Sequence, residues 1–475
     1  MGSHTLLNRL TAAWSLAVAG VLFWFFHRQG FDDPFITYRY AENLASGSGF
    51  VYNSGEQVLS TTAPLYAMLL AVLQVARADL PLASNALGCL SLALGGWTFW
   101  CLGRVWHAPW AAMTGLLLFP TFPHLLSTLG AETIFSITLI LLAFLAYASG
   151  RYSVVAALLA LATITRADAV LAGVVLAADF LLRRRGPIPW RALLIYLAMI
   201  APWFIFAAFY FGAPFPVTLF VKQRQALLPD SQSFFTGFLQ VYGPGYWRQP
   251  WYWPHFALAG VGLGYALGRD RRWLMLPAWS LLYFAVYSML GVTRYFWYYA
   301  PLVPGFIALA AIGVEALARI AQRFLSHWGT VACVSMLVLL PFFAQGRSLD
   351  ALRQANDPRL TVYQQAGEWL QRETPQNASV GTLEVGVIGY HAHRRMIDFA
   401  GLIQPEVALQ LTPSSSYQAA AIWAVDRFRP DYLVLQDGLF LGLEEHLARV
   451  ARCQSLQTFS HPAYAWPVVI HRCEY

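Results

Sequence analysis

Long apolar runs separated by short basic turns fill the first 345 residues of the chain. A helix needs about 20 apolar residues to cross the hydrocarbon core of a membrane. Runs close to that length lie at 10–27, 83–103, 131–149, 191–211, 272–290, 296–317 and 328–344. Shorter runs lie at 109–123, 153–165, 167–182 and 255–268. The pattern predicts a polytopic α-helical membrane protein with about eleven spans, of which the shorter ones are tilted or partly enclosed by protein.

The apolar stretch 62–77 decides how these spans are oriented. If it lies in the interface or re-enters the membrane without crossing it, the basic clusters all fall on one side, which is then the cytoplasmic side. The clusters are Arg104, Arg151, Arg183-Arg184-Arg185 with Arg191, Arg269 with Arg271 and Arg272, and Arg319 with Arg323. We therefore expect a cytoplasmic N-terminus. Four segments then lie outside, at 28–60, 129–132, 212–254 and after about residue 345.

The last part of the chain differs in composition from the apolar part. Short β-rich runs at 379–383 and 432–435 alternate with a helical pattern at 362–372, which is typical of a small soluble α/β domain. We expect a transmembrane domain with outer loops at 1–345 and an extracytoplasmic soluble α/β domain at 346–475. Cys453 and Cys473 are the two cysteines of this outer domain, where oxidation is permitted, and we predict that they form a disulfide.

Composition supports the membrane assignment. The chain is 58% hydrophobic and 12% charged, whereas soluble proteins carry about 25% charged residues. Its 18 Trp and 23 Tyr suit the boundary between membrane and water. The net charge of +7 comes from the basic clusters that orient the spans. We therefore expect membrane lipid, and no nucleic acid, among the partners.

The segment 31–64 carries the most unusual chemistry. Asp32 and Asp33 follow the first apolar run directly, and a short interfacial helix is expected at 38–45. Two adjacent carboxylates near lipid are electrostatically costly unless they are paired or used in chemistry. The alternative is that they cap the helix that follows, since Asp is a good N-cap.

This segment resembles the first outer loop of the GT-C glycosyltransferases, most closely in the branch that includes mycobacterial arabinofuranosyltransferases. The matching residues are Asp32, Asp33, Ile36, Arg39, Tyr40, Ala41, Asn43, Leu44, Ala45, Gly47, Gly49, Asn53, Gly55 and Glu56. Further likenesses lie at 130–133 (G-x-E-T), 161–168 (L-A-x-x-x-R-x-[DE]), 212–222 (G-x-x-x-P-x-[ST]-x-x-x-K) and 386–405 (I-G-Y-x-x-x-R-x-I-D-x-x-G-L-x-x-P). The chain departs from the family at 167–168 and 59–62, which leaves the sugar and the acceptor open.

The resemblance implies transfer of a sugar from a polyprenyl-phosphate donor to a hydroxyl of a cell-envelope glycan, lipid or protein. The sugar would be a pentose such as arabinofuranose or a hexose such as mannose, and the enzyme would lie in a plasma membrane of bacterial type. Phosphate is a good leaving group that needs cations to hold its developing charge, and the acceptor hydroxyl needs a base. Asp32 or Asp33 is the expected base, with Asp32 ahead because related families usually use the first acid of the pair.

The expected donor-phosphate ligands are Lys222, Arg224 and Arg294, all on the predicted outer side. The expected acceptor or sugar ligands are Arg39, Tyr40, Asn53, Glu56, Glu132 and His391. Alternatives are open for several of them. Lys222 and Arg224 could be solvated loop charges, Arg294 an interfacial anchor, and Glu132 a helix cap. His391 and His393 have metal-like spacing without a third ligand, so we expect surface histidines and no metal site.

We expect no required cofactor. A divalent cation at Asp32 and Asp33 is the least supported role for that pair, because no further ligands are apparent. Two other protein classes compete with a transferase. A transporter or flippase tends to have inverted repeats and charges at mid-membrane, whereas the charges here cluster at the predicted outer edge. A non-catalytic scaffold or receptor would have no functional role for the Asp32–Asp33 pair.

Overall fold

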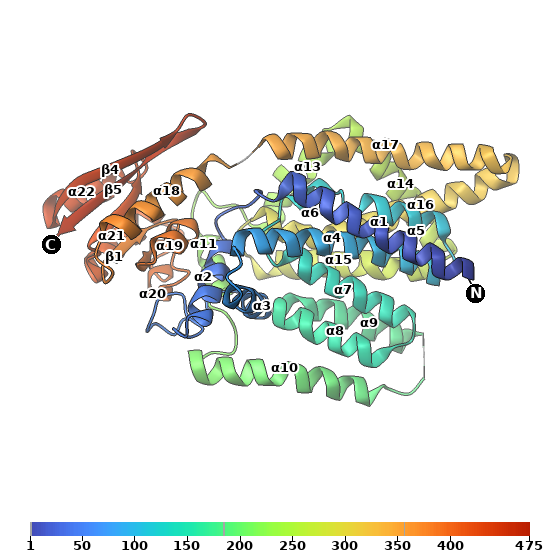
Figure 1. The fold of residues 1–475 in the computed structure, drawn as a ribbon, viewed down its shortest axis with the longest axis horizontal. Helices are drawn as coiled ribbons and strands as arrows, with labels where there is room; N and C mark the ends of the chain where they lie inside the picture. Colours follow the sequence, from blue (N-terminus) through green and yellow to red (C-terminus); the bar gives the residue numbers. More distant parts are fainter. Residues whose placement is uncertain (1, 184–185, 356) are drawn as a thin grey trace.

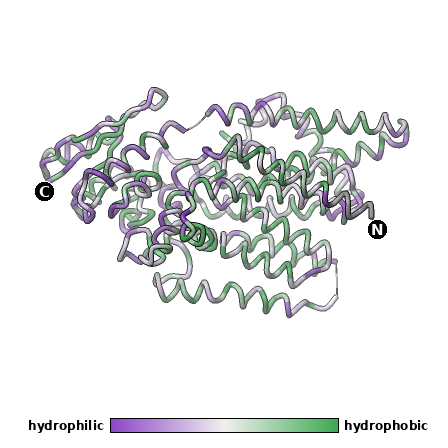
Figure 2. Tube along the Cα trace, viewed as in Figure 1, coloured by the Kyte–Doolittle hydropathy of each residue, from purple (hydrophilic) through white to green (hydrophobic). Residues whose placement is uncertain are grey.

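The computed structural model describes residues 2–183, 186–355 and 357–475, so Arg184 and Arg185 of the predicted basic run lie outside the described residues. Figure 1 shows a long helix bundle with a smaller sheet-containing domain at one end, and the N-terminus at the opposite end. Figure 2 shows apolar residues concentrated along the bundle, while polar residues gather in the smaller domain and at the bundle's ends. The end of the bundle that carries the smaller domain is called the sheet end below.

The helices of the bundle and its loops follow in chain order. The first half has α1 (Gly2–Phe26), α2 (Pro34–Ala45), α3 (Pro64–Val75), α4 (Leu80–Val105), α5 (Pro109–Leu118), α6 (Pro123–Leu126), α7 (Thr133–Ala148), α8 (Tyr152–Thr165), η1 (Ala167–Ala169), α9 (Val170–Leu182) and α10 (Trp190–Phe211). The second half has α11 (Thr218–Gln225), α12 (Phe234–Gly237), η2 (Phe238–Tyr242), α13 (Gly243–Trp247), η3 (Pro250–Tyr252), α14 (Trp253–Gly268), η4 (Arg271–Leu274), α15 (Met275–Leu290), η5 (Phe296–Leu302), α16 (Val303–Phe324) and α17 (His327–Gln354).

Six helices of the described chain are long and apolar enough to cross a membrane, namely α1, α4, α10, α15, α16 and α17. Four shorter apolar helices accompany them, α3, α5, α7 and α8. The polytopic helical membrane domain is therefore confirmed. The predicted interfacial stretch 62–77 forms α3, whose 12 residues reach only about 18 Å at the helical rise of 1.5 Å per residue. This is too short for a hydrocarbon core of about 30 Å.

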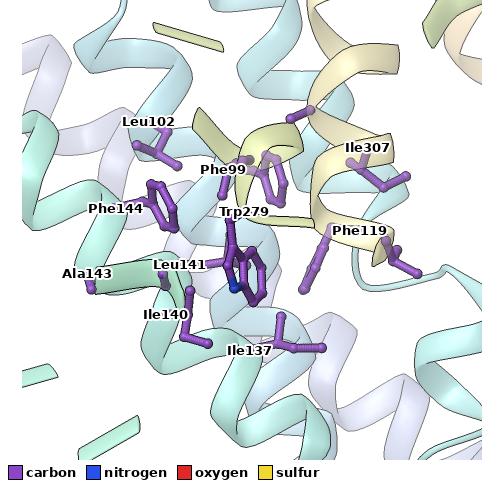
Figure 3. Packing of buried hydrophobic residues seen from close by; sticks show 14 of the residues in the cluster. Phe99, Leu102, Phe119, Ile137, Ile140, Leu141, Ala143, Phe144, Trp279 and Ile307 are labelled. Carbon is purple, nitrogen blue, oxygen red and sulfur yellow. The ribbon is translucent and has the colours of Figure 1, made fainter. Parts of the chain in front are cut away.

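The bundle is held together by close apolar packing between its long helices. Figure 3 shows Phe99 of α4, Phe144 of α7, Trp279 of α15 and Ile307 of α16 meeting in one core. The tightest crossing lies between α14 and α16, because a Cβ added at Gly262 would lie 1.9 Å from the Leu309 carbonyl oxygen. Small residues let membrane helices approach backbone to backbone in this way.

The smaller domain follows the long helix α17, which continues past its apolar part to Gln354. Its elements are α18 (Pro358–Glu373), β1 (Ser379–Thr382), α19 (Val387–Ala392), β2 (Arg395–Asp398), α20 (Pro405–Ala408), α21 (Tyr417–Phe428), β3 (Tyr432–Gln436), α22 (Leu441–Val450), β4 (Arg452–His461) and β5 (Tyr464–Glu474). The predicted strands at 379–383 and 432–435 are β1 and β3, and the predicted helix at 362–372 lies within α18. The soluble α/β fold of this domain is confirmed.

The five strands form one mixed sheet in the order β2-β1-β3-β5-β4. The strands β2, β1 and β3 run parallel, whereas β5 pairs antiparallel with β3 and β4. The edge strands are thus β2 and β4. Cys453 of β4 lies directly opposite Cys473 of β5 in this register, and the two are joined by a disulfide, which confirms that prediction.

Candidate active site

A cavity of about 450 Å³ opens at the sheet end of the bundle. Its walls come from segments that are far apart in the sequence. The polar lining includes Asp33, Thr37, Glu132, Arg166, Asp168, Thr218, Lys222, Tyr287 and Tyr298, and Leu402 of the sheet domain adds an apolar contact. Charged side chains occupy two parts of this lining, which we call the Asp33–Lys222 pair and the Arg166 cluster.

The Asp33–Lys222 pair joins the first loop, residues 27–63, to α11. Lys222 is 3% exposed, and its Nζ lies 3.7 Å from Asp33 Oδ2 and 3.8 Å from the centroid of the Tyr295 ring. The helix α11 is fixed by its own first residue, because the Thr218 hydroxyl donates to the Ser60 carbonyl oxygen at 2.7 Å. Asp33 occupies the N-cap position of α2, but its side chain makes no capping hydrogen bond with any described residue. Its carboxylate is therefore free to face Lys222 and the cavity.

Lys222 is a cation held against the cavity wall. Burial lowers the pKa of Lys222, but the charge of Asp33 and its other acidic neighbours outweigh burial and raise that pKa above its ordinary value. A buried ammonium of this kind can exchange its carboxylate partner for another anion, because its desolvation is already compensated by a negative charge.

The Arg166 cluster is a compact group of buried charges. Arg166 Nη1 donates to Glu132 at 2.9 Å, and Arg166 Nη2 donates to Asp168 at 2.7 Å. The Tyr287 hydroxyl donates to the same Asp168 carboxylate. Two acids share one guanidinium, so the cluster carries excess negative charge. Glu132 makes no capping hydrogen bond to the described residues of α7, because it binds Arg166 instead.

Asp32 points away from the cavity, toward the sheet domain. The backbone N–H groups of Gly386 and Val387 donate to its carboxylate at 3.0 and 2.8 Å. Burial, followed by the negative charge of Glu384, raises the pKa of Asp32 to about 8, although the two N–H groups oppose this shift. Adjacent aspartates thus have different environments, and of the two it is Asp33 that lines the cavity.

The other predicted acceptor or sugar ligands, apart from Glu132, are not among the residues that line the cavity. Arg39, Asn53 and Glu56 bind the sheet domain instead. The Tyr40 hydroxyl donates to the Val58 carbonyl oxygen within the first loop. His391 packs edge-on against Tyr390.

Two of the predicted phosphate ligands also lie off this cavity. Arg224 stacks over Phe220 of its own helix. Arg294 packs with Tyr299 against Gly237, and Tyr299 lines a second cavity of about 660 Å³ with aromatic walls. The described residues include no cluster of three or more His, Cys, Asp or Glu side chains arranged to hold a metal ion.

Several cavity residues were missed by the sequence analysis. Arg166 and Asp168 lie in the 161–168 motif, which gave a signal that was not used for the site. Trp297 and Tyr298 belong to the aromatic run that follows Arg294, and the sequence predicted no role in the site for this run. Leu402 is placed by Asp398, whose buried carboxylate accepts from the Ala400 and Leu402 N–H groups at 2.7 and 2.5 Å.

Glu384 adds a third carboxyl group near the Asp32–Asp33 pair. Burial raises the pKa of Glu384 to about 7, and the charges of Asp33 and Asp398 add to this effect, while Arg359 and Lys222 oppose it. Glu384 belongs to the turn that precedes Gly386, so the sheet domain contributes directly to the electrostatics around Asp33.

Comparison with solved structures places the fold. ArnT from Cupriavidus metallidurans bound to undecaprenyl phosphate matches at a TM-score of 0.65 and 16% identity, over 99% of this chain and 98% of ArnT. ArnT in the apo state matches at a TM-score of 0.67 and 15% identity over the same shares. The Archaeoglobus fulgidus oligosaccharyltransferase in the apo form matches at a TM-score of 0.57 and 14% identity, over 89% of this chain and 69% of that protein.

Comparison by sequence adds less. Residues 351–470 match the family described as "Domain of unknown function (DUF8728)", which covers most of the sheet domain. No curated protein matches the sequence. The fold likeness nevertheless extends over nearly the whole chain, including the sheet domain behind the helix bundle. The chain therefore has the GT-C fold, as its first-loop resemblance had implied.

Proposed function

We propose that this protein is a membrane glycosyltransferase that moves a sugar from a polyprenyl-phosphate donor to an acceptor hydroxyl. The observation that carries the proposal is one cavity in which a carboxylate, Asp33, lies 3.7 Å from a buried cation, Lys222. The GT-C fold supports it, because ArnT of the same fold has been solved bound to undecaprenyl phosphate. The acceptor is a hydroxyl of a cell-envelope glycan, lipid or protein.

Lys222 receives the donor phosphate in this mechanism. The phosphate replaces Asp33 as the anion beside Nζ, and a charge-assisted contact to an ammonium is stronger than one between neutral groups. As the bond between the anomeric carbon and the phosphate oxygen breaks, its electron pair moves to the phosphate. Lys222 stabilises that growing negative charge, which is the role of a fixed cation at a leaving group.

Asp33 is the general base of the proposal. When Lys222 turns to the phosphate, the Asp33 carboxylate is released to accept the proton of the acceptor hydroxyl. The oxygen of that hydroxyl attacks the anomeric carbon and forms the new glycosidic bond. We assign the base to Asp33 and not to Asp32, because the Asp32 carboxylate is occupied by two backbone N–H groups outside the cavity.

The Arg166 cluster is suited to hold the sugar ring. Carboxylates accept hydrogen bonds from sugar hydroxyls, and Glu132 and Asp168 keep acceptor capacity beyond their bonds to Arg166. Arg166 and Tyr287 fix both acids in place. Pentose and hexose donors, with arabinofuranose and mannose as examples, both offer the hydroxyls that such a cluster binds.

The positions of the basic residues support the orientation that we propose. Arg151 follows the end of α7, whose start adjoins the cavity residue Glu132, and Arg269 follows the end of α14. Basic loops stay on the cytoplasmic side. The cavity and the sheet domain accordingly face the outside of a plasma membrane, where polyprenyl-phosphate sugars meet envelope acceptors.

The test uses purified full-length protein in lipid nanodiscs with synthetic polyprenyl-phosphate arabinofuranose and mannose, and with a cell-envelope extract that supplies the acceptor hydroxyl. Wild-type protein should release polyprenyl phosphate from one of the two donors. Asp33→Asn should lower kcat by about 10²–10⁴-fold, as loss of a positioned base does, with little change in donor binding. Asp230→Asn, at an exposed acid of a neighbouring loop, is the matched control. Release from neither donor, or an Asp33→Asn variant as active as the control, would contradict the proposal.

A further inference from the structure

The first loop, residues 27–63, binds the sheet domain through buried polar contacts. We propose that these contacts form a lock that holds the sheet domain over the cavity, and that Asp32 is a positioning residue of this lock. The proposal rests on the proposed function, because what the lock positions is the Asp33 base. It also gives a task to the sheet domain, most of which matches a family without a known function.

Asp32 and Gly386 form one close contact of the lock. Both oxygens of the Asp32 carboxylate accept backbone N–H groups, from Gly386 and Val387, at the start of α19. A Cβ added at Gly386 would lie 2.1 Å from the Asp32 backbone oxygen and 2.4 Å from its Oδ2. The φ angle of Gly386 is −64°, which any residue adopts. Glycine is therefore required at this position for space, and the space is filled by Asp32.

Gly389, three residues after Gly386, makes a similar close contact with the first loop. A Cβ added at Gly389 would lie 1.8 Å from the Tyr52 hydroxyl oxygen. That hydroxyl donates to the Val385 carbonyl oxygen at 2.5 Å. Residues three apart share one face of a helix, so Gly386, at the N-cap of α19, and Gly389, within α19, form a smooth face that fits against the first loop.

Arg39 and Asn53 complete the lock. Arg39 is buried and donates to the carbonyl oxygens of Gly389 and Arg394 at 2.6 and 3.2 Å. Asn53 pairs with the edge strand β2, because its Nδ2 donates to the Met396 carbonyl oxygen at 2.9 Å and its Oδ1 accepts the Met396 N–H at 3.0 Å. A single amide side chain thus satisfies both backbone groups of an edge-strand residue, in the way a neighbouring strand would.

An apolar core runs through the same interface. Tyr40, Phe50 and Tyr52 of the first loop belong to one buried cluster with Val387 and Ile388 of α19 and with residues of α18 and the sheet. This core shields the buried polar groups of the lock from water. A buried donor or acceptor that loses its partner is costly, because water cannot replace that partner. The two segments are parts of one packed unit and not neighbours in loose contact.

This unit sets the position of the proposed base. Asp33 follows Asp32 directly, so a carboxylate clamped on α19 fixes the backbone from which Asp33 reaches Lys222. The same docking brings Leu402 onto the cavity wall. Loosening the lock should displace Asp33 without removing any charged group from the cavity, and a misplacement of about 1 Å can cost about 10² in rate.

The experiment compares hydrogen exchange and turnover in full-length protein in nanodiscs. Gly386→Ala keeps every charged side chain, and Asp32→Asn replaces one of the two oxygens that accept the Gly386 and Val387 N–H groups. Both should speed amide exchange in peptides covering 384–396 and lower kcat by about 10²-fold, with little change in the donor KM. Asn53→Ala, which inserts no atoms, should give the same pattern with a smaller loss of rate. Gly30→Ala is the matched control, because its added Cβ would meet only Leu360 Cδ1, at 3.9 Å.

Asp33→Asn separates positioning from chemistry. It should lower kcat while leaving exchange at 384–396 as in the wild type. An Asp32→Asn variant that loses turnover with wild-type exchange would show that Asp32 acts on substrate and would overturn the proposal. Wild-type exchange and turnover in Gly386→Ala and Asn53→Ala would overturn it as well. The exchange comparison needs no turnover, so failure of the transferase assay in wild-type protein would refute the proposed function and still leave the lock to be decided.

Discussion

Replacing Lys222 by Met tests the cationic side of the mechanism. Met keeps the length and apolar character of the lysine stem and removes the charge. At 3.7 Å from Asp33 Oδ2, Nζ interacts with a unit negative charge by about 4 kcal/mol at an effective dielectric constant of 20. A donor phosphate that takes the place of Asp33 meets a comparable field. Losing one preorganised group that stabilises charge in the transition state costs about 10²–10³ in kcat, and we expect Lys222→Met to fall in that range.

The assay measures release of polyprenyl phosphate and, separately, donor binding to protein in nanodiscs. Lys222→Arg keeps the charge, but the larger guanidinium must share the space over Tyr295, so we expect it to recover only part of the rate. Arg224→Met is the comparison variant, because Arg224 lies on the same helix but stacks on Phe220; its rate should stay within about twofold of the wild type. A Lys222→Met variant with near-normal kcat/KM would refute the reasoning, as would an equal loss in Arg224→Met.

Two further predictions concern stability. Gly262→Ala should lower the Tm in detergent through an overpacking cost of about 1–3 kcal/mol, because its Cβ would lie 1.9 Å from the Leu309 carbonyl oxygen. Gly264→Ala, with open space at its Cβ, should leave the Tm unchanged, and equal effects would argue against helix contact as the cause. The pKa of Glu384 is raised from 4.5 to about 7 in the folded protein, so the folded state holds a proton that the unfolded chain has lost. The free energy of unfolding should therefore fall as pH rises through this window, by roughly 3 kcal/mol. Glu384→Gln should flatten the fall measured by Tm between pH 5 and 8, and an unchanged slope would assign the titration elsewhere.

Much of the fold could be predicted because membrane helices and strands follow from local hydropathy. Each of the predicted apolar runs falls on a helix, and the stretch 62–77 forms α3, which is too short to span. The disulfide followed from cysteine placement and compartment. The end of α17 could not be predicted, because the helix continues to Gln354 through residues that are no longer apolar.

The candidate site was predicted only in part, because sequence motifs name residues without showing which way they face. Asp32 and Asp33 are adjacent in sequence, yet one lies against α19 and the other lines the cavity. Arg39, Asn53 and Glu56 belong to the same motif and bind the sheet domain, a contact that joins residues more than 300 positions apart. Arg166 lies in a motif that was noticed, but its ion pairs with Glu132 and Asp168 are tertiary contacts.

The separation between Asp32 and Gly386 has a consequence for biosynthesis. The two residues are 354 positions apart, so at about 5–20 residues per second the ribosome needs roughly 20–70 s to make the partner of a loop that has already left it. During that interval the sheet-domain residues that pack against Phe50 and Tyr52 in the folded protein have not yet been synthesised, so these two side chains lack that part of their core. A nascent chain that has not reached Gly386 already contains Asp33, Lys222 and Arg166, but its first loop does not yet have the α19 contacts to Asp32. Under the proposed function, the lock that positions Asp33 therefore forms only as translation ends.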